Sequence, residues 1–197
     1  MPLHAAPVQP LPKAASRPSA TVVMGVSGCG KSTVAQALAA QLGLEMIDGD
    51  DLHLPHSVAK MRAGQALNDA DRWPWLDRIG QCLAQDLTQG LPSHACPSHS
   101  GRVVACSALK QIYRDRLRRL APGVRFVFLD GDAELIRQRL SARLGHYMQP
   151  QLLASQLQTL ERPQPEEVDV LTLNLSLPVA ELVRLVRAEL WPERALA

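Results

Sequence analysis

The sequence predicts an α/β protein in three layers, with a central parallel β-sheet covered by helices on both faces. Two observations support this fold class. Short apolar segments rich in β-branched residues alternate along the chain with longer segments of helical periodicity. A glycine-rich turn follows directly after the first of these apolar segments. Ligands of such sheets bind at the carboxyl ends of the strands, so the candidate functional residues are sought there.

In the first half of the chain, β-branched and apolar residues predict strands at residues 21–26, 44–47 and 102–107. The first expected helix covers residues 31–43, with an apolar stripe on one face and Gly43 as its C-cap. A second helix is expected at residues 71–87, where three large apolar residues lie in line: Trp75, Ile79 and Leu83.

The second half of the chain continues the alternation. Strands are expected at residues 124–129 and 168–175, and helices at residues 109–120, 132–145, 150–160 and 179–190. Asp132 is the expected N-cap of the helix 132–145, whose apolar stripe is formed by Ile136, Leu140 and Leu144. Strands and helices that alternate throughout predict a parallel sheet covered by helices.

The composition limits the class of protein. The chain has 197 residues, of which 46% are hydrophobic and 20% charged, as expected of one globular domain. We expect this domain at residues 21–192, after a disordered Pro/Ala-rich tail at residues 1–20. Residues 91–101 read as a surface loop insert. A net charge of +2 gives no electrostatic case for a nucleic-acid partner.

The sequence also indicates in which cellular compartment the protein is expected. No apolar run is long enough to span a bilayer, and the first residues contain no apolar signal segment, so no membrane partner is expected. The four cysteines show neither metal-ligand spacing nor the density of a disulfide scaffold. Reduced thiols in the cytoplasm are the simplest account.

The glycine-rich turn has the pattern of a phosphate-binding loop. "GVSGCGKS" places Gly25, Gly30, Lys31 and Ser32 at the required spacing, between an expected strand and an expected helix. Backbone N–H groups would surround phosphate oxygens, Lys31 would reach the β- and γ-phosphates, and the Ser32 hydroxyl would bind Mg²⁺. The cofactors expected are ATP and Mg²⁺, and the expected ATP-binding residues of the loop are Gly25, Ser27, Gly28, Cys29, Gly30, Lys31, Ser32 and Thr33.

Three aspartates follow the second expected strand, in "DGDD". Because this strand ends at the same sheet edge as the phosphate loop, Asp48 is expected to hold a water molecule on Mg²⁺, which makes it a candidate metal residue with Ser32. Asp50 is expected to face an acceptor hydroxyl and to orient it or take its proton. Asp51 is expected to cap the following helix. The alternative is that all three are turn and cap residues.

Six blocks in order resemble the gluconokinases of the bacterial P-loop type. They are "MGVSGCGKSTVA", "DGDDLH", "KMRAGQALNDADRWPWL", "ACSALKQIYRDRLR", "RLSARLGHYM" and "LLASQLQTLERP", and the resemblance covers roughly residues 20–190. It implies the fold of a P-loop kinase with a helical lid, similar to shikimate and nucleoside monophosphate kinases. It also implies transfer of the γ-phosphoryl group of ATP to the 6-hydroxyl of D-gluconate, and a homodimer.

The resemblance implies roles for individual residues. Asp50 would be the catalytic carboxylate, with Lys31 beside it. Arg139 and Arg143 would close over the phosphates from a lid at about residues 137–160, binding ATP and stabilising the transition state. The acceptor would be held by Asp50, His53, Lys60, Arg72, Lys110, Arg114 and His146. A solvated surface position is the alternative for each of these cations and for His146.

Other functions of the same fold stay open at this point. Another small-molecule kinase, such as a shikimate kinase, would need a similar set of cations for its acceptor. A nucleoside monophosphate kinase would need a long base-binding segment that the sequence does not show. The near-neutral charge and the intact carboxylate pair argue against a nucleotide switch or a nucleic-acid ATPase, and the histidine of "DGDDLH" and the "CSALK" block favour gluconate over shikimate. Two features depart from the family: the length of the Pro/Ala-rich tail and the insert at residues 91–101.

Overall fold

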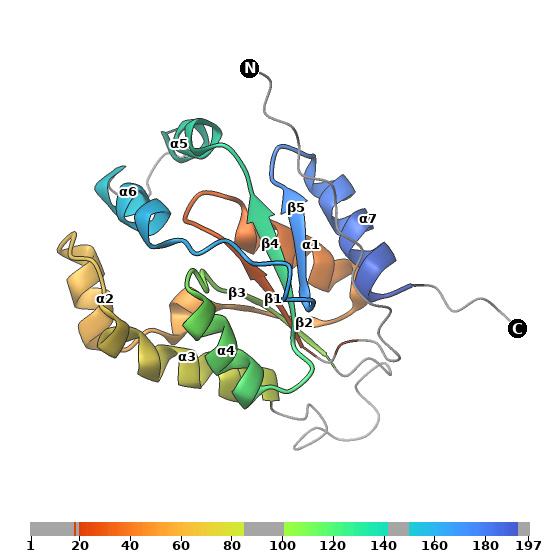
Figure 1. Cartoon of the computed structure of the whole chain (residues 1–197), viewed down its shortest axis with the longest axis horizontal. Coiled ribbons are helices and arrows are strands. Elements are labelled where there is room, and N and C mark those ends of the chain that lie inside the picture. The colour runs from red at the N-terminus through yellow and green to blue at the C-terminus, as the bar shows by residue number, and fades with distance from the viewer. Residues whose placement is uncertain (1–17, 19, 85–100, 142–149, 193–197) are drawn as a thin grey trace, which may run out of the picture.

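A computed structural model describes residues 18, 20–84, 101–141 and 150–192 of the chain. Its centre is a five-stranded parallel sheet with the strand order β2-β3-β1-β4-β5. The strands are β1 (Ala20–Met24), β2 (Glu45–Asp48), β3 (Arg102–Ala105), β4 (Arg125–Asp130) and β5 (Val170–Asn174). Helices cover both faces of the sheet, as the sequence predicts (Figure 1).

The central strands β1, β3 and β4 are mostly apolar because both of their faces are buried, whereas the edge strand β2 begins and ends with a carboxylate. Alternate residues of one strand enter different cores. Val23 of β1 faces one core, while its neighbours Val22 and Met24 face the other. The two faces of β4 divide in the same way, with Val127 and Phe126 in different cores. This pattern explains why near-continuous apolar runs identified the strands.

Helices α1 (Lys31–Leu42) and α7 (Val179–Leu190) form one outer layer (Figure 1). Their apolar stripes, including Leu38 and Val186, pack into the same core. Gly43 ends α1 in the left-handed conformation, and its N–H donates to the Ala39 carbonyl. The expected C-cap is therefore confirmed.

Helices α3 (Asp69–Ala84) and α4 (Gln111–Leu120) form the opposite layer (Figure 1). The predicted line of Trp75, Ile79 and Leu83 is buried against the sheet. Helix α3 begins two residues earlier than predicted because Asn68 and Asp71 form reciprocal side-chain to backbone hydrogen bonds of 2.9 and 3.0 Å at its first turn. Such a capping box satisfies N–H groups that a helix start leaves unpaired.

Short helical elements lie at the carboxyl ends of the strands. The turn η1 (Gly49–Leu52) and helix α2 (Pro55–Arg62) follow β2, while α5 (Ala133–Ser141) and α6 (Pro150–Thr159) follow β4. Figure 1 shows α2, α5 and α6 near this end of the molecule. Asp132 accepts the N–H of Glu134 at 2.7 Å, which confirms it as the cap of α5. The sequence analysis did not identify η1 or α2.

Other expectations remain predictions. Most of the tail at residues 1–20 and all but the last residue of the insert 91–101 lie outside the described residues. The same is true of residues 142–149 in the expected lid. Among the helices that the structure describes, none is long and apolar enough to cross a membrane.

Candidate active site

The phosphate loop joins β1 to α1 with the geometry that its sequence predicts. Gly28 and Gly30 have φ angles of +82° and +102°, which side chains with a Cβ atom rarely adopt. A Cβ atom at Gly28 would also lie 2.5 Å from Leu140 of α5. Helix α1 begins at Lys31 without a side-chain cap, so its first N–H groups face the loop. The loop can therefore receive an anion at a helix N-terminus.

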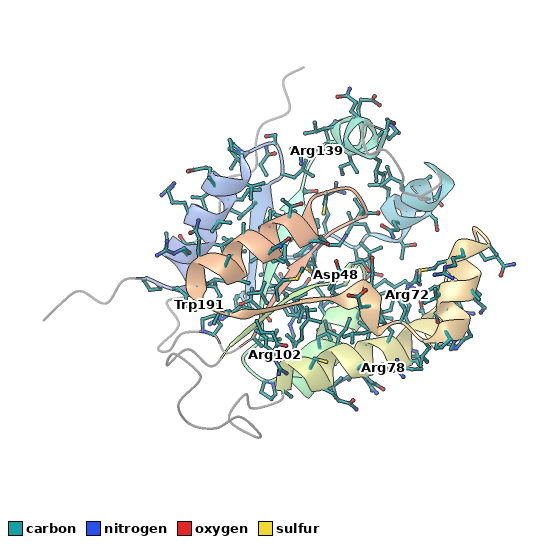
Figure 2. The ribbon with its side chains drawn as sticks, turned by 180° about the vertical axis from the view of Figure 1, so that it is seen from behind. Asp48, Arg72, Arg78, Arg102, Arg139 and Trp191 are labelled. Carbon is teal, nitrogen blue, oxygen red and sulfur yellow. The ribbon has the colours of Figure 1, made fainter. Side chains whose placement is uncertain are left out.

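Two candidate metal residues meet beside this loop. The Ser32 Oγ atom donates to Asp48 Oδ2 at 2.8 Å. Asp48 ends β2, and Figure 2 shows it near the centre of the molecule. The hydrogen bond joins the first turn of α1 to the end of β2, at the carboxyl edge of the sheet. Lys31 lies in the same region, where its Nζ atom donates to the Val26 carbonyl at 3.1 Å.

The aspartates after β2 have distinct positions. Asp48 caps η1 by accepting the Asp50 N–H at 3.1 Å. Asp50 has an exposed carboxylate, and it lines the pocket beside the phosphate loop. Asp51 is exposed, while α2 has Leu54 as its N-cap and no side-chain cap. The prediction that Asp51 caps the following helix is therefore wrong, because Asp51 lies inside η1 and the N-cap of α2 is Leu54.

One pocket connects the phosphate loop with α3 and α6. Its floor includes Ser27 and Lys31, and Asp50 and His53 follow from the end of β2. Arg72 and Trp75 enter from α3. The remaining lining residues are Met61, Ala66, Leu67, Ser107, Leu109, Ser155, Gln156 and Thr159. The pocket thus places a phosphate-binding loop, a carboxylate and a guanidinium around one space.

His53 is held flat against Trp75, with ring centroids 4.3 Å apart and an interplanar angle of 10°. The Trp75 indole N–H donates to the Gly49 carbonyl at 2.6 Å, which ties this pair to η1. Burial lowers the pKa of His53, and the opposing effect of Asp50, 3.9 Å away, is smaller. His53 is therefore neutral at pH 7, and its Nδ1 atom is buried without a hydrogen-bond partner among the described residues.

Arg72 and Lys110 belong to a cluster around Asp69. Lys110 donates to both Asp69 oxygens at 2.8 and 2.9 Å, and the Tyr113 hydroxyl donates to Oδ1 at 2.5 Å. Arg72 donates to the Tyr113 oxygen at 3.2 Å, and its guanidinium is 3.9 Å from Asp69. The hydrogen bonds from Lys110 and Tyr113 lower the pKa of Asp69, and the same carboxylate raises the pKa of Lys110. Two cations thus share one carboxylate, and of the two only Arg72 is among the residues that line the pocket.

Like Lys110, the predicted acceptor residues Lys60 and Arg114 are not among the residues that line the pocket. The Lys60 ammonium donates to both oxygens of Asp71, at 2.7 and 2.9 Å. Arg114 is 1% exposed and forms a bidentate ion pair with Glu167 at 2.6 and 2.7 Å. The prediction that Arg114 faces the cleft is therefore wrong, because its guanidinium is buried in a structural ion pair. Lys60 has an acidic partner in place of the predicted acceptor.

Arg114 still has a connection with the site. Its Nη1 atom donates to the Ala108 and Leu109 carbonyls, each at 3.3 Å, and to the Glu161 carbonyl at 3.1 Å. Ala108 has a φ angle of +40°, an uncommon conformation for a residue with a side chain. Ser107 and Leu109 on either side of it line the pocket. Arg114 therefore holds the strained loop that carries two lining residues.

The expected lid is described in part. Arg139 of α5 donates to the Leu175 carbonyl at 2.9 Å, beyond the end of β5 (Figure 2). Leu140 of the same helix lies directly over Gly28 of the phosphate loop. Helix α5 is therefore positioned above the loop, as a lid would be. Arg143 and His146 lie outside the described residues.

Known proteins resemble this chain over most of its length. A family model described as "AAA domain" matches residues 21–163. A curated gluconokinase from Gluconobacter oxydans is 42% identical over 171 residues, covering 87% of this chain and 91% of the relative. The thermoresistant gluconokinase of Escherichia coli is 40% identical over 82% of this chain and 87% of its own length. The chain belongs to the gluconokinase family.

A solved structure supports the same family. The crystal structure of a gluconokinase from Sinorhizobium meliloti is 45% identical, has a TM-score of 0.76, and covers 88% of this chain and 91% of its own. The family resemblance drawn from six sequence blocks is thereby confirmed, as is the α/β class. These relatives give no support for the alternative functions of a nucleotide switch or a nucleic-acid ATPase.

Several residues of this gluconokinase-family site were not identified from the sequence. Asp69 and Tyr113 organise the two cations, and Gln156 of α6 accepts the Ser27 N–H at 2.6 Å. The quoted blocks "NDADRWPW" and "LLASQLQTLERP" contained Asp69 and Gln156 but gave neither a role. A carboxylate between cations three and forty-one residues away, Arg72 and Lys110, has no signature in local spacing.

The geometry fits a nucleotide with Mg²⁺. Ser32 and Asp48 offer one hydroxyl and one carboxylate, which are the oxygen ligands that would hold Mg²⁺ beside the phosphate loop. Among the described residues, no cluster of three or more His, Cys, Asp or Glu side chains forms a metal cage. A site that shares its metal with phosphates needs few protein ligands, so the residues present suit this use.

Proposed function

We propose that this protein transfers the γ-phosphoryl group of ATP to the 6-hydroxyl of D-gluconate, giving 6-phospho-D-gluconate and ADP. The observation that carries the proposal is the single pocket that joins Ser27 and Lys31 of the phosphate loop to Asp50 and Arg72. Such a pocket can hold the phosphoryl donor and a polar acceptor next to each other. The names of the curated relatives support gluconate as that acceptor.

The donor side works through charge and position. Phosphoryl transfer leaves the protein little covalent chemistry, so catalysis depends on alignment and on stabilising charge at the phosphate oxygens. The loop N–H groups and the Lys31 ammonium provide positive charge at the β- and γ-phosphates. Ser32 and Asp48 would hold Mg²⁺, which neutralises phosphate charge when bound. Arg139 and Arg143 are proposed to add cations from the lid.

Asp50 is the proposed catalytic carboxylate. Its carboxylate is exposed and lines the pocket. Asp48, and not Asp50, accepts the hydrogen bond from Ser32. In the proposed step, O6 of gluconate attacks the γ-phosphorus while the bond to the β–γ bridging oxygen breaks. Asp50 orients the hydroxyl and accepts its proton, and ADP leaves.

The acceptor side has the chemistry of a sugar acid. Arg72 lines the pocket from α3, and Lys110 belongs to the same cluster through Asp69, so the carboxylate of the acceptor is proposed to bind on this side. His53 and the lining hydroxyls supply hydrogen bonds along a polyol. His146 is proposed as a further contact. Lys60 and Arg114 are assigned to structural ion pairs instead.

The domain limits and the cellular context are proposals as well. We assign the catalytic domain to residues 21–192, with the lid at about residues 137–160, and place it in the cytoplasm as a homodimer. A small-molecule acceptor, neither nucleic acid nor membrane, is the proposed partner. The net charge of +2 is consistent with that choice.

The test is acceptor-dependent ADP release. The full chain with Mg-ATP is given D-gluconate, shikimate, AMP or no acceptor, and two variants are measured beside it. Asp50→Asn keeps the shape of the side chain but removes its charge, and we expect a loss of roughly 100-fold or more in kcat. Asp51→Asn is the matched control, because Asp51 is an exposed neighbour in the same turn and does not line the pocket.

Each result has a clear meaning. ADP release that requires gluconate and fails only in Asp50→Asn supports the proposal. Release with shikimate or AMP in place of gluconate would contradict the acceptor assignment while keeping the kinase. Release without any acceptor, equal in both variants, would contradict the kinase reaction itself.

A further inference from the structure

Helix α6 is fixed beside the phosphate loop by contacts at both of its ends. Leu153 near its start is buried in the core that also contains Leu38 of α1 and Val186 of α7. Just after its end, the Glu161 N–H donates to the Leu109 carbonyl at 2.9 Å, and Arg114 donates to the Glu161 carbonyl. Leu109 itself lines the pocket. The helix between these anchors therefore presents its side chains to the pocket from a defined position.

Gln156 on this helix has a fixed orientation. Its Oε1 atom accepts the backbone N–H of Ser27 at 2.6 Å, across 129 residues of sequence. A backbone N–H can only donate, so the atom that meets it must be the carboxamide oxygen. The amide nitrogen of the same group therefore points elsewhere with two N–H donors.

The surroundings of Gln156 are those of the reacting groups. It lines the same pocket as Lys31 and Asp50, and Arg72 and His53 line the acceptor side. Its neighbours Ser155 and Thr159 on α6 line the pocket too. Gln156 is thus a neutral side chain that contacts the phosphate loop through its Oε1 atom and lines the same pocket as Arg72 and His53.

We propose that Gln156 is a positioning residue that joins the acceptor site to the phosphate loop. Its Oε1 atom holds the Ser27 N–H, and its Nε2 group donates to an oxygen of the bound sugar acid. Through these two bonds it sets the distance between acceptor and phosphoryl donor. The inference rests on the proposed function, and it assigns to α6 a role in acceptor binding.

The test replaces the carboxamide by an apolar side chain of the same length. Gln156→Met removes both hydrogen bonds, and Gln158→Met on the exposed side of α6 is the matched control. Steady-state kinetics give KM for gluconate, KM for ATP and kcat, and calorimetry gives the Kd of a non-hydrolysable ATP analogue. We expect kcat/KM for gluconate to fall by about 10- to 30-fold in Gln156→Met, as for the loss of one or two buried hydrogen bonds. The Kd of the ATP analogue should change by less than about threefold.

The proposal is tested by comparing the loss in kcat/KM for gluconate with the change in nucleotide binding. A defect concentrated in gluconate, with the melting temperature and analogue binding close to those of Gln158→Met, supports the positioning role. Equal losses for gluconate and nucleotide, or no loss relative to Gln158→Met, would overturn it. Failure of the proposed function is seen separately in the unmodified protein: if another acceptor is phosphorylated, the same variants measured with that acceptor still decide the role of Gln156.

Discussion

At the scale of single residues, Asp69 explains how Arg72, which lines the pocket, and Lys110 can lie close together. Lys110 and Arg72 would repel each other without the carboxylate between them. Tyr113 completes the cluster by donating to Asp69 and accepting from Arg72. The cluster carries a net positive charge, so it remains attractive to the carboxylate of a sugar acid.

Arg72 provides the first prediction at this scale. Arg72→Gln should raise KM for D-gluconate by about 10- to 100-fold, because a hydrogen bond to a charged group is lost. KM for ATP should stay within about threefold, since Arg72 lies on the acceptor side. Steady-state kinetics with each substrate varied in turn measure both effects.

Arg78 is the control for this experiment. It is an exposed arginine on the same helix, farther from α2 than Arg72 (Figure 2), and it donates to the Leu52 carbonyl at 3.3 Å. Arg78→Gln should leave both KM values near those of the unmodified protein. If the two substitutions have the same effect on gluconate, Arg72 is not an acceptor contact.

At the scale of elements, the contact between α3 and α4 depends on Gly80. A Cβ atom at this position would lie 2.5 Å from Leu120 of α4. Helix propensity alone predicts that alanine stabilises an exposed helix by about 1 kcal/mol relative to glycine. Here overpacking opposes that gain, because the atoms in the way include the Leu120 Cβ atom, which can move only together with the backbone of α4.

Gly80→Ala should therefore lower the free energy of unfolding by about 1–2 kcal/mol. Urea denaturation of the variant and of Gln81→Ala, an exposed neighbour in the same helix, measures the difference. If Gly80→Ala is more stable than the unmodified protein, the gain in helix propensity exceeds the cost of overpacking, and α4 can move away from α3.

The helices, strands and loops also show how much of the fold could be predicted from the sequence. The phosphate loop and the strands were predictable because their information is local: a contiguous motif, or a short run of apolar residues. Helix α2 was missed because "PHSVAKMR" is short and has no apolar stripe. Arg114 was misplaced because its partner, Glu167, is 53 residues away, and no local spacing shows that this arginine turns inward.

At the scale of the whole molecule, an ion-pair network ties α4 to the segment before β5. Glu167 accepts from Arg114 and from Arg118, and Arg118 also pairs with Asp169. Burial alone would raise the pKa of Glu167, but the hydrogen bonds from the two arginines lower it to about 2. Because Arg114 also holds the loop around Ala108, this network supports both the fold and one wall of the pocket.

Glu167→Gln should lower the free energy of unfolding by about 3 kcal/mol at pH 7, since it leaves a buried guanidinium without its counter-charge. The pKa of Glu167 is lowered in the folded state, so its stabilising effect is complete above its ordinary value of 4.5. The effect disappears as the pH falls from there toward about 2. Urea denaturation at pH 7, 5 and 3 should show that the free energies of unfolding of Glu167→Gln and of the unmodified protein become more similar as the pH falls.

Glu166→Gln is the control, because Glu166 is the exposed neighbour of Glu167. It should change stability by less than about 0.5 kcal/mol at every pH. A difference for Glu167→Gln that stays constant from pH 7 to pH 3 would show that the ion pair is not the source of the stability.

The central claim is that a phosphoryl group reaches the 6-hydroxyl of D-gluconate, and ³¹P NMR of the reaction mixture tests it most directly. The full chain with Mg-ATP and D-gluconate should give one new phosphomonoester signal, split into a triplet by the two protons on C6, together with the signals of ADP. A doublet would place the phosphate on a secondary hydroxyl and contradict the proposed orientation of the acceptor. The absence of any new monoester while ATP persists would contradict the function itself.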